Sequence, residues 1–178
     1  AFRNAPNYDA PADQGQDNVY DLTVSVSDGA ITTSRATSVT VTNVDEAPVF
    51  ASPAAVSVAE NGAGVVTVRA SDQDAGTTLS YSISGTDASL FTIDSATGVL
   101  RFVAAPDYEV PSDLGANNVY NLTVQVSDGA HAVTQALAVT VTNVIEVHIN
   151  RLRGKLDKGR DESLIQTIRG RGYALAID

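Results

Sequence analysis

One block of 39 residues occurs twice in this chain of 178 residues, at a spacing of 100 residues. Residues 6–44 and 106–144 align without a gap and are identical at 23 of 39 positions. A period of about 100 residues is far longer than a solenoid repeat and has the size of a whole domain. We therefore expect tandem domains, with a first copy cut short on its N-terminal side and a complete second copy over residues 48–144.

Apolar and polar residues alternate through the second copy in the manner of β-strands. Residues 120–126 and 133–141 have the period of two that is typical of a strand with one buried face. Shorter candidates lie at residues 55–59, 64–69, 78–83, 90–93 and 98–103. These seven short strands predict an all-β fold, an antiparallel β-sandwich, with Val124, Val126, Leu137, Val139 and Val141 inside it.

Residues 1–47 contain only the last two strands of the same pattern. Without the other strands of a sandwich, they cannot bury the apolar face of those two. We therefore expect a poorly packed hairpin in this first segment.

The net charge changes sign along the chain. Residues 1–144 hold 16 Asp and Glu against four Arg, which gives −12, whereas residues 145–178 hold five acidic and seven basic residues, which gives +2. The acidic body should attract cations and repel nucleic acid, and the tail can do the reverse.

Several classes of function lack support in this sequence. The chain has no Cys, which excludes a disulfide scaffold and a thiolate zinc site. It also has no GxSxG, HExxH, P-loop or GxGxxG motif. We therefore expect no enzymatic activity and no small-molecule substrate.

Acidic residues gather in turns and at strand ends. Asp72 and Asp74 form a pair in one turn, Asp107 and Glu109 repeat that spacing, and Ser-Asp-Gly occurs at 27–29 and 127–129. Asp and Asn also cap turns for structural reasons, so any single one of them proves little. As a set, however, they offer the hard oxygen ligands that Ca²⁺ prefers.

In their order and spacing these motifs resemble the cadherin repeat, and the bacterial adhesin form is the more similar. The motifs are Ala-Glu60-Asn-Gly, Asp72-x-Asp74-x-Gly, Asp107-Tyr-Glu109, Val-x-Val-Ser-Asp128-Gly and Asn43-Val-Asp45-Glu46-Ala-Pro. The resemblance implies a seven-stranded Greek-key sandwich with Ca²⁺ at each junction between repeats. It further implies an extracellular or cell-surface adhesion module, whose partners are neighbouring repeats or another cell-surface protein.

The resemblance also implies a ligand set. The junction inside the chain would use Asp9, Asp45 and Glu46 from the first copy and Asp72, Asp74 and Asp128 from the second. Glu60, Asp107 and Glu109 match ligands of the following junction. Asn7, Thr42 and Val44 replace ligand positions of the family, so we expect one or two ions at the internal junction instead of three.

The tail departs from the repeat after Val144. Ile145, Ile149, Leu152 and Leu156 recur at the spacing of an apolar helix stripe, and residues 164–168 and 173–177 suggest two strands around a Gly-rich turn. The blocks Val-His-Ile-x-Arg-Leu-Arg-x-Lys-Leu (147–156) and Ile-x-Thr-Ile-Arg-Gly-x-Gly-Tyr (165–173) resemble the OmpR-type winged-helix domain of two-component response regulators.

That second resemblance implies DNA contacts and a cytoplasmic regulator as the alternative function. The implied DNA-binding residues are Arg151, Arg153, Lys155, Thr167 and Arg169. The first sheet and the first two helices of the winged-helix domain are missing, so we expect only weak, non-specific DNA contact. We interpret the chain as a chimera with segments 1–47, 48–144 and 145–178, joined where Asn143-Val144 fits either family.

Overall fold

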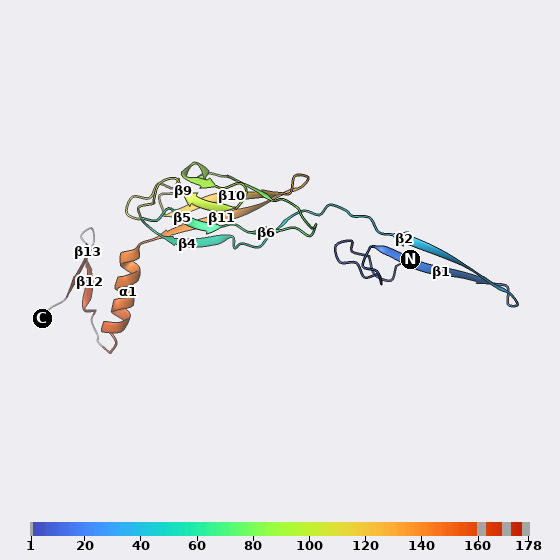
Figure 1. Ribbon diagram of the computed structural model, residues 1–178. Helices are drawn as coiled ribbons and strands as arrows, with labels where there is room; N and C mark the ends of the chain where they lie inside the picture. The colour runs from blue at the N-terminus through green and yellow to red at the C-terminus, as the bar shows by residue number, and fades with distance from the viewer. Residues whose placement is uncertain (1, 160–162, 169–171, 176–178) are drawn as a thin grey trace.

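The computed structural model describes residues 2–159, 163–168 and 172–175. Figure 1 shows three parts in a row: an extended hairpin, a sandwich, and a helix with a second hairpin. No helix in the described ranges is long and apolar enough to cross a membrane.

The sandwich has one four-stranded and one three-stranded sheet, which confirms the predicted all-β fold. The first sheet has the order β4 (Ala55–Ala59), β11 (Ala132–Thr142), β10 (Val119–Ser127) and β7 (Ser80–Ser84). The second sheet has the order β5 (Gly64–Thr67), β9 (Val99–Phe102) and β8 (Phe91–Ile93). A short 3-10 helix, η1 (Ala88–Leu90), directly precedes β8.

Each of the seven predicted strands has a counterpart, but two further strands were missed. These are β3 (Val49–Phe50) and β6 (Ala70–Ser71), which pair with each other. Two residues are too few to show a period of two, so the sequence pattern could not reveal them. The pairing of β4 with β11 is parallel, in contrast to the predicted all-antiparallel arrangement.

The core lies between the two sheets. Along β10, buried and exposed positions alternate, and Tyr120, Leu122, Val124 and Val126 face inwards. The ring of Tyr120 stands edge-on to Phe91 and Phe102, at centroid distances of 5.7 and 5.2 Å. Such edge-to-face contacts add about 0.5–1.5 kcal/mol to the burial of the rings. Val124, Val126, Leu137, Val139 and Val141 are buried, as predicted.

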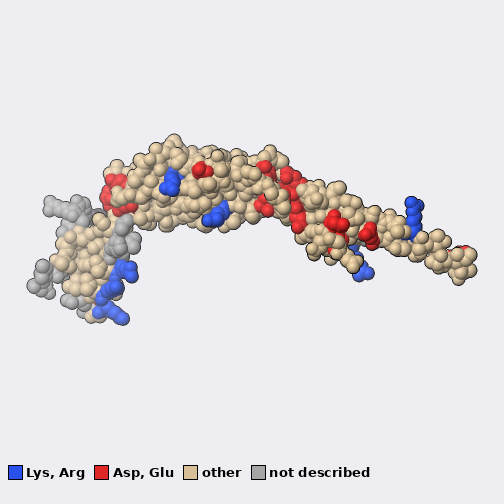
Figure 2. Space-filling model, in the orientation of Figure 1, with Lys and Arg blue, Asp and Glu red and all other residues tan. Residues whose placement is uncertain are grey.

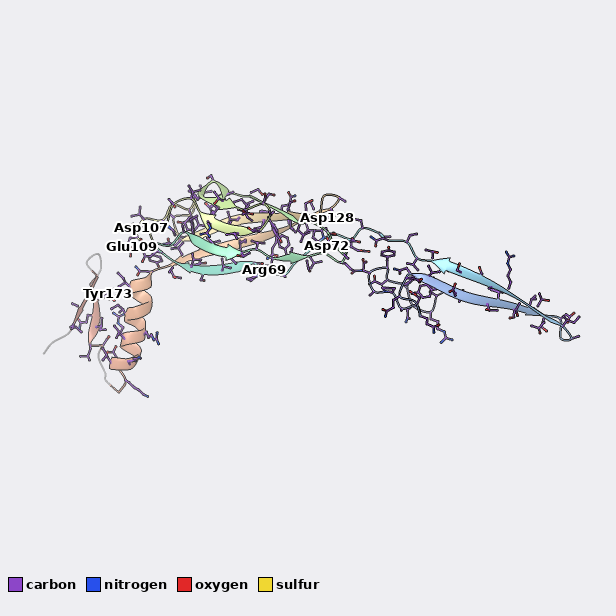
Figure 3. The ribbon with its side chains drawn as sticks, in the orientation of Figure 1. Arg69, Asp72, Asp107, Glu109, Asp128 and Tyr173 are labelled. Carbon is purple, nitrogen blue, oxygen red and sulfur yellow. The ribbon has the colours of Figure 1, made fainter. Side chains whose placement is uncertain are left out.

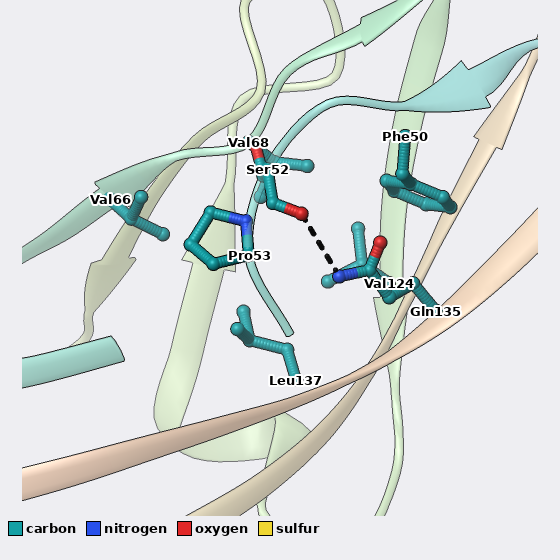
Figure 4. A pocket seen from close by; sticks show the side chains of 8 residues that line it. All are labelled: Phe50, Ser52, Pro53, Val66, Val68, Val124, Gln135 and Leu137. Carbon is teal, nitrogen blue, oxygen red and sulfur yellow. Dashed lines mark hydrogen bonds between the residues drawn. The ribbon is translucent and has the colours of Figure 1, made fainter. Parts of the chain in front are cut away.

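A small, mostly apolar pocket at the core contains one polar contact (Figure 4). The side-chain amide of Gln135 donates a hydrogen bond of 3.2 Å to the backbone carbonyl of Ser52. Phe50, Pro53 and Leu137 line the same pocket, whose volume is about 10 Å³. That is about the space of one water molecule, so this pocket does not hold a larger ligand.

The N-terminal hairpin consists of β1 (Val19–Ser27) and β2 (Thr32–Thr40). Its register matches that of β10 and β11 at the spacing of the repeat, since Tyr20 pairs with Val39 as Tyr120 pairs with Val139. Almost every residue of the hairpin is exposed. The predicted poorly packed hairpin is therefore observed.

The tail forms α1 (Val144–Leu156), β12 (Ile165–Ile168) and β13 (Gly172–Leu175), which confirms the predicted helix and hairpin. Residues 176–177 of the second predicted strand lie outside the described residues. Strands β12 and β13 pair antiparallel. Ile165 is buried, whereas Leu152 and Leu156 are about half exposed. Among the tail side chains that the structure describes, Ile165 is therefore the one that is buried.

Candidate metal centres

The turn after β10 fixes Asp128 in place. Its Oδ1 accepts hydrogen bonds from the backbone N–H groups of Ala130 and His131, at 2.7 and 2.5 Å. These bonds lower the pKa of Asp128, that from His131 most. Its Oδ2 is buried and has no hydrogen-bond partner among the described residues. One oxygen of the carboxylate thus holds the turn, and the other faces the junction between the copies.

The turn after β6 joins the second copy to the linker. Asp74 Oδ2 accepts a hydrogen bond of 3.0 Å from the backbone N–H of Glu46, and Oδ1 accepts one of 2.6 Å from the side-chain amide of Asn43. These bonds, that from Asn43 most strongly, lower the pKa of Asp74. In the same turn, Asp72 Oδ1 accepts a hydrogen bond from the N–H of Asp74. The linker is therefore fixed to a turn of the second copy.

The same turn also contacts the first copy directly. The side-chain amide of Gln73 donates to Asn7 Oδ1 at 3.1 Å and to Asp9 Oδ2 at 3.2 Å. Asp9 is thereby held next to the acids of the second copy.

Two groups of possible metal ligands result at this junction. Asp9, Glu46 and Asp74 form the first group, and Asp45, Asp128 and His131 form the second. Within each group one ligand atom of every residue lies within 4.8 Å of the others. Asp72 and Asp128 lie at the end of the sandwich that faces the N-terminal hairpin (Figure 3). Acidic side chains gather on the surface here (Figure 2).

Burial and the crowding of negative charge both act on Glu46. Its pKa is raised, first by burial and then by the charges of Asp74, Asp9, Asp45 and Asp72. Like charges at such short range destabilise one another unless a proton or a cation intervenes.

The donor atoms at the junction fit Ca²⁺. Glu46 Oε2, Asp72 Oδ2 and Asp128 Oδ2 are buried and have no hydrogen-bond partner in the described part of the chain. Buried acceptors are normally satisfied, so three at one place need an explanation, and a bound cation is one. Carboxylate oxygens are the ligands that Ca²⁺ prefers.

A third group lies at the opposite end of the sandwich. It contains Glu60, Asp107 and Glu109, and Figure 3 shows the last two near the start of α1. Glu109 accepts a hydrogen bond from the side chain of Asn143, as Asp74 does from Asn43. Burial, together with the charges of Glu60 and Asp107, raises the pKa of Glu109. Helix α1 follows this end, so the turns of a further repeat do not complete the group here.

Eight of the nine residues expected as Ca²⁺ ligands belong to these groups, and Asp72 lies beside the first one. Their role as ligands stays a prediction, as do the domain boundaries after residues 47 and 144. Sequence reasoning missed His131, which the second group includes. Its position three residues after Asp128, in a turn with acidic neighbours, was the available signal.

Two of the residues expected to bind DNA, Arg153 and Thr167, make contacts within the tail itself. The Arg153 guanidinium donates from Nε to the carbonyl of Ile165 at 2.9 Å and from Nη2 to Thr167 Oγ1 at 2.7 Å. It also lies 5.6 Å from the ring centroid of Tyr173. Arg153 and Thr167 thus hold α1 against the hairpin.

The other three expected DNA contacts are less constrained. Arg151 and Lys155 are exposed on α1, where Figure 2 shows basic side chains. Arg169 lies outside the described residues. The described tail therefore offers fewer free basic groups than its sequence suggests.

Comparison with known proteins gives two different relationships within the chain. Residues 54–148 match the cadherin domain family, and residues 131–175 match the C-terminal family of transcriptional regulatory proteins. The chain is 34% identical to Cadherin-23 of Rattus norvegicus over 151 residues, which are 78% of this chain and 4% of that protein.

The tail is similar to a bacterial regulator. It is 53% identical to the transcriptional regulatory protein CusR of Escherichia coli strain K12 over 36 residues, 20% of this chain and 16% of that protein.

The fold of this chain is similar to the crystal structure of mouse Cadherin-23 EC22-24. The TM-score is 0.55, with 26% identity over 75% of this chain and 45% of that chain. The chain spans only a small part of the length of these curated relatives.

Proposed function

The chain belongs to the cadherin family, and from this premise we propose that its body is a calcium-rigidified adhesion module. The module would be part of a bacterial cell-surface or secreted adhesin, and its partners would be neighbouring repeats or another cell-surface protein. The observation that carries the proposal is the set of buried carboxylate oxygens without hydrogen-bond partners among the described residues of the junction.

The residues of the junction would act by joining the N-terminal segment to the sandwich. Asp9, Asp45 and Glu46 approach from the first copy and its linker, and Asp72, Asp74 and Asp128 approach from the second. A bound Ca²⁺ would supply the positive charge that holds these carboxylates together. The hydrogen bonds from Asn43 and Glu46 to Asp74 already orient the linker for this role.

Calcium should stabilise the folded chain. At about 10 mM Ca²⁺, a site with a dissociation constant of about 0.1–1 mM adds about 1.4–2.7 kcal/mol to the free energy of unfolding, because only the native state binds. Urea unfolding, followed by circular dichroism with Ca²⁺ or with chelator, measures this difference. Asp74→Ala and Asp45→Ala should each remove most of the gain.

Asp94→Ala is the matched control for this experiment. Asp94 Oδ1 also caps a turn, by accepting hydrogen bonds from the N–H groups of Ala96 and Thr97. It belongs to none of the three acidic groups. Its loss should lower stability but leave the response to Ca²⁺ unchanged. Equal stability of the unmutated chain in Ca²⁺ and in chelator would contradict the proposal.

For the tail we propose only residual, non-specific DNA binding. Its similarity to a transcriptional regulator favours some affinity, and the exposed Arg151 and Lys155 can neutralise phosphates. Specific recognition needs a helix held in the groove by the rest of its domain, however. The body adds charge repulsion, which salt screens.

In a gel-shift assay we therefore expect weak binding without sequence preference, lost between about 50 and 200 mM salt. The double substitution Arg151→Gln and Lys155→Gln should weaken it, whereas Arg101→Gln in β9 should not. Selection of a preferred sequence from a random pool would instead support the regulator as the main function.

A further inference from the structure

One of the three acidic groups contains a nitrogen donor. The groups at Asp9 and at Glu60 consist of carboxylates alone, whereas the group of Asp45 and Asp128 includes the imidazole of His131. The repeat has Ile31 at the corresponding position. The first copy forms the same turn, with Asp28 Oδ1 accepting hydrogen bonds from Ala30 and Ile31. The turn itself therefore does not require His131.

The geometry brings three different ligands to one point. His131 Nδ1 lies 3.0 Å from Asp45 Oδ2 and 3.7 Å from Asp128 Oδ2. The Asp128 side chain is only 2% exposed, and its Oδ2 has no hydrogen-bond partner in the described residues. This buried oxygen faces the imidazole, while Asp45 and His131 are about half exposed and leave the point open to solvent.

From these contacts we propose that Asp45, Asp128 and His131 bind a borderline divalent cation of the Zn²⁺ class. Tetrahedral Zn²⁺ with bonds of about 2.0–2.2 Å separates neighbouring ligand atoms by about 3.4 Å, close to the observed spacings. Three protein ligands leave the fourth position for water.

Ligand chemistry separates this site from the calcium site. Imidazole suits Zn²⁺, Cu²⁺ and Ni²⁺, whereas Ca²⁺ takes oxygen ligands. The inference rests on the proposed function in that both use the same junction between the two copies and share two of its carboxylates. Asp45 and Asp128 also belong to the proposed Ca²⁺ set, so His131 is the one ligand that belongs to the Zn²⁺ group alone. The two ions therefore predict different effects of a change at His131.

Calorimetric titration of the full chain with Zn²⁺ tests the site, in a His148→Gln background that removes the other histidine. The test variant is His131→Ile, which restores the residue of the first copy in the same turn. We expect its Zn²⁺ affinity to fall by about 10- to 100-fold or more, since altering even the outer shell of a metal site has that effect. Stabilisation by Ca²⁺ should not change.

A measurement on the unmutated chain removes the dependence on how the variant folds. Zn²⁺ should shift the ¹⁵N resonance of His131 Nδ1, and a chain with Asp128→Asn should show a smaller shift at equal Zn²⁺. An unaltered His131 resonance, or equal Zn²⁺ affinity in His131→Ile, would overturn the inference. If Ca²⁺ still stabilises the chain in that case, the calcium proposal stands. If Zn²⁺ binds through His131 but Ca²⁺ does not stabilise the chain, the Zn²⁺ site stands and the calcium proposal is contradicted.

Discussion

Leu122→Ala is expected to lower the free energy of unfolding of the sandwich by about 2–5 kcal/mol, the range for truncating a buried leucine. Leu122 points into the core from β10 and is 3% exposed. Leu22 is its counterpart in the repeat, occupies the same position in β1 and is 50% exposed. Leu22→Ala should therefore change stability by no more than about 0.5 kcal/mol.

Urea unfolding followed by far-ultraviolet circular dichroism measures both variants under the same conditions. The pair is well matched, because the neighbours Val-Tyr-x and Thr-Val are the same in both strands. A cost at Leu22 as large as that at Leu122 would mean that another surface covers the hairpin in solution. That result would contradict the exposed hairpin described above.

Gly98→Ala is expected to have a similarly large effect, for a different reason. The φ angle of Gly98 is +69°, and a Cβ there would overlap the backbone carbonyl oxygen of Val68. The N–H of Val68 donates to the carbonyl of Gly98 at 2.8 Å, which prevents the two segments from separating easily. The loss in the free energy of unfolding has two parts: about 1–2 kcal/mol from placing alanine in a left-handed backbone conformation and about 1–3 kcal/mol from overpacking.

Gly76→Ala isolates the first of these two contributions. Its φ is +85°, but a Cβ at that position would have nothing within 4 Å. In chelator, it should cost only the strain, about 1–2 kcal/mol. If thermal melting shows equal losses for Gly76→Ala and Gly98→Ala, the close approach of Gly98 to Val68 is wrong.

Local structure could be predicted from the sequence because the repeat encodes it twice. The loop before β1 and the loop before β10 are alike: Asp13 and Asp113 each accept two backbone N–H hydrogen bonds from the residues four and five positions later. The hairpins also share their register, although only one is buried. Neighbouring residues therefore determine the turn and the register, whereas burial depends on the rest of a sandwich.

Features that depend on distant contacts could not be predicted in the same way. The sequence indicated which acids could bind a cation, but not that His131 would lie beside Asp45, 86 positions away in the chain. It also suggested Arg153 as a DNA contact, without revealing its bonds to Ile165 and Thr167. In both cases a side chain meets a partner whose position only the folded chain defines.

The parallel pairing of β4 with β11 has a consequence for a chain under tension. Ala55 lies beside Ala138 and Ala59 beside Thr142, so β4 begins at one end of this pairing and β11 finishes at the other. A force pulling the sandwich from both ends therefore slides the strands along each other and loads their hydrogen bonds together. In the hairpin, Val19 and Thr40 lie at the same end, and a pull there opens the bonds one after another. The parallel direction of β4 and β11 thus makes the sandwich resist stretching more than the hairpin does.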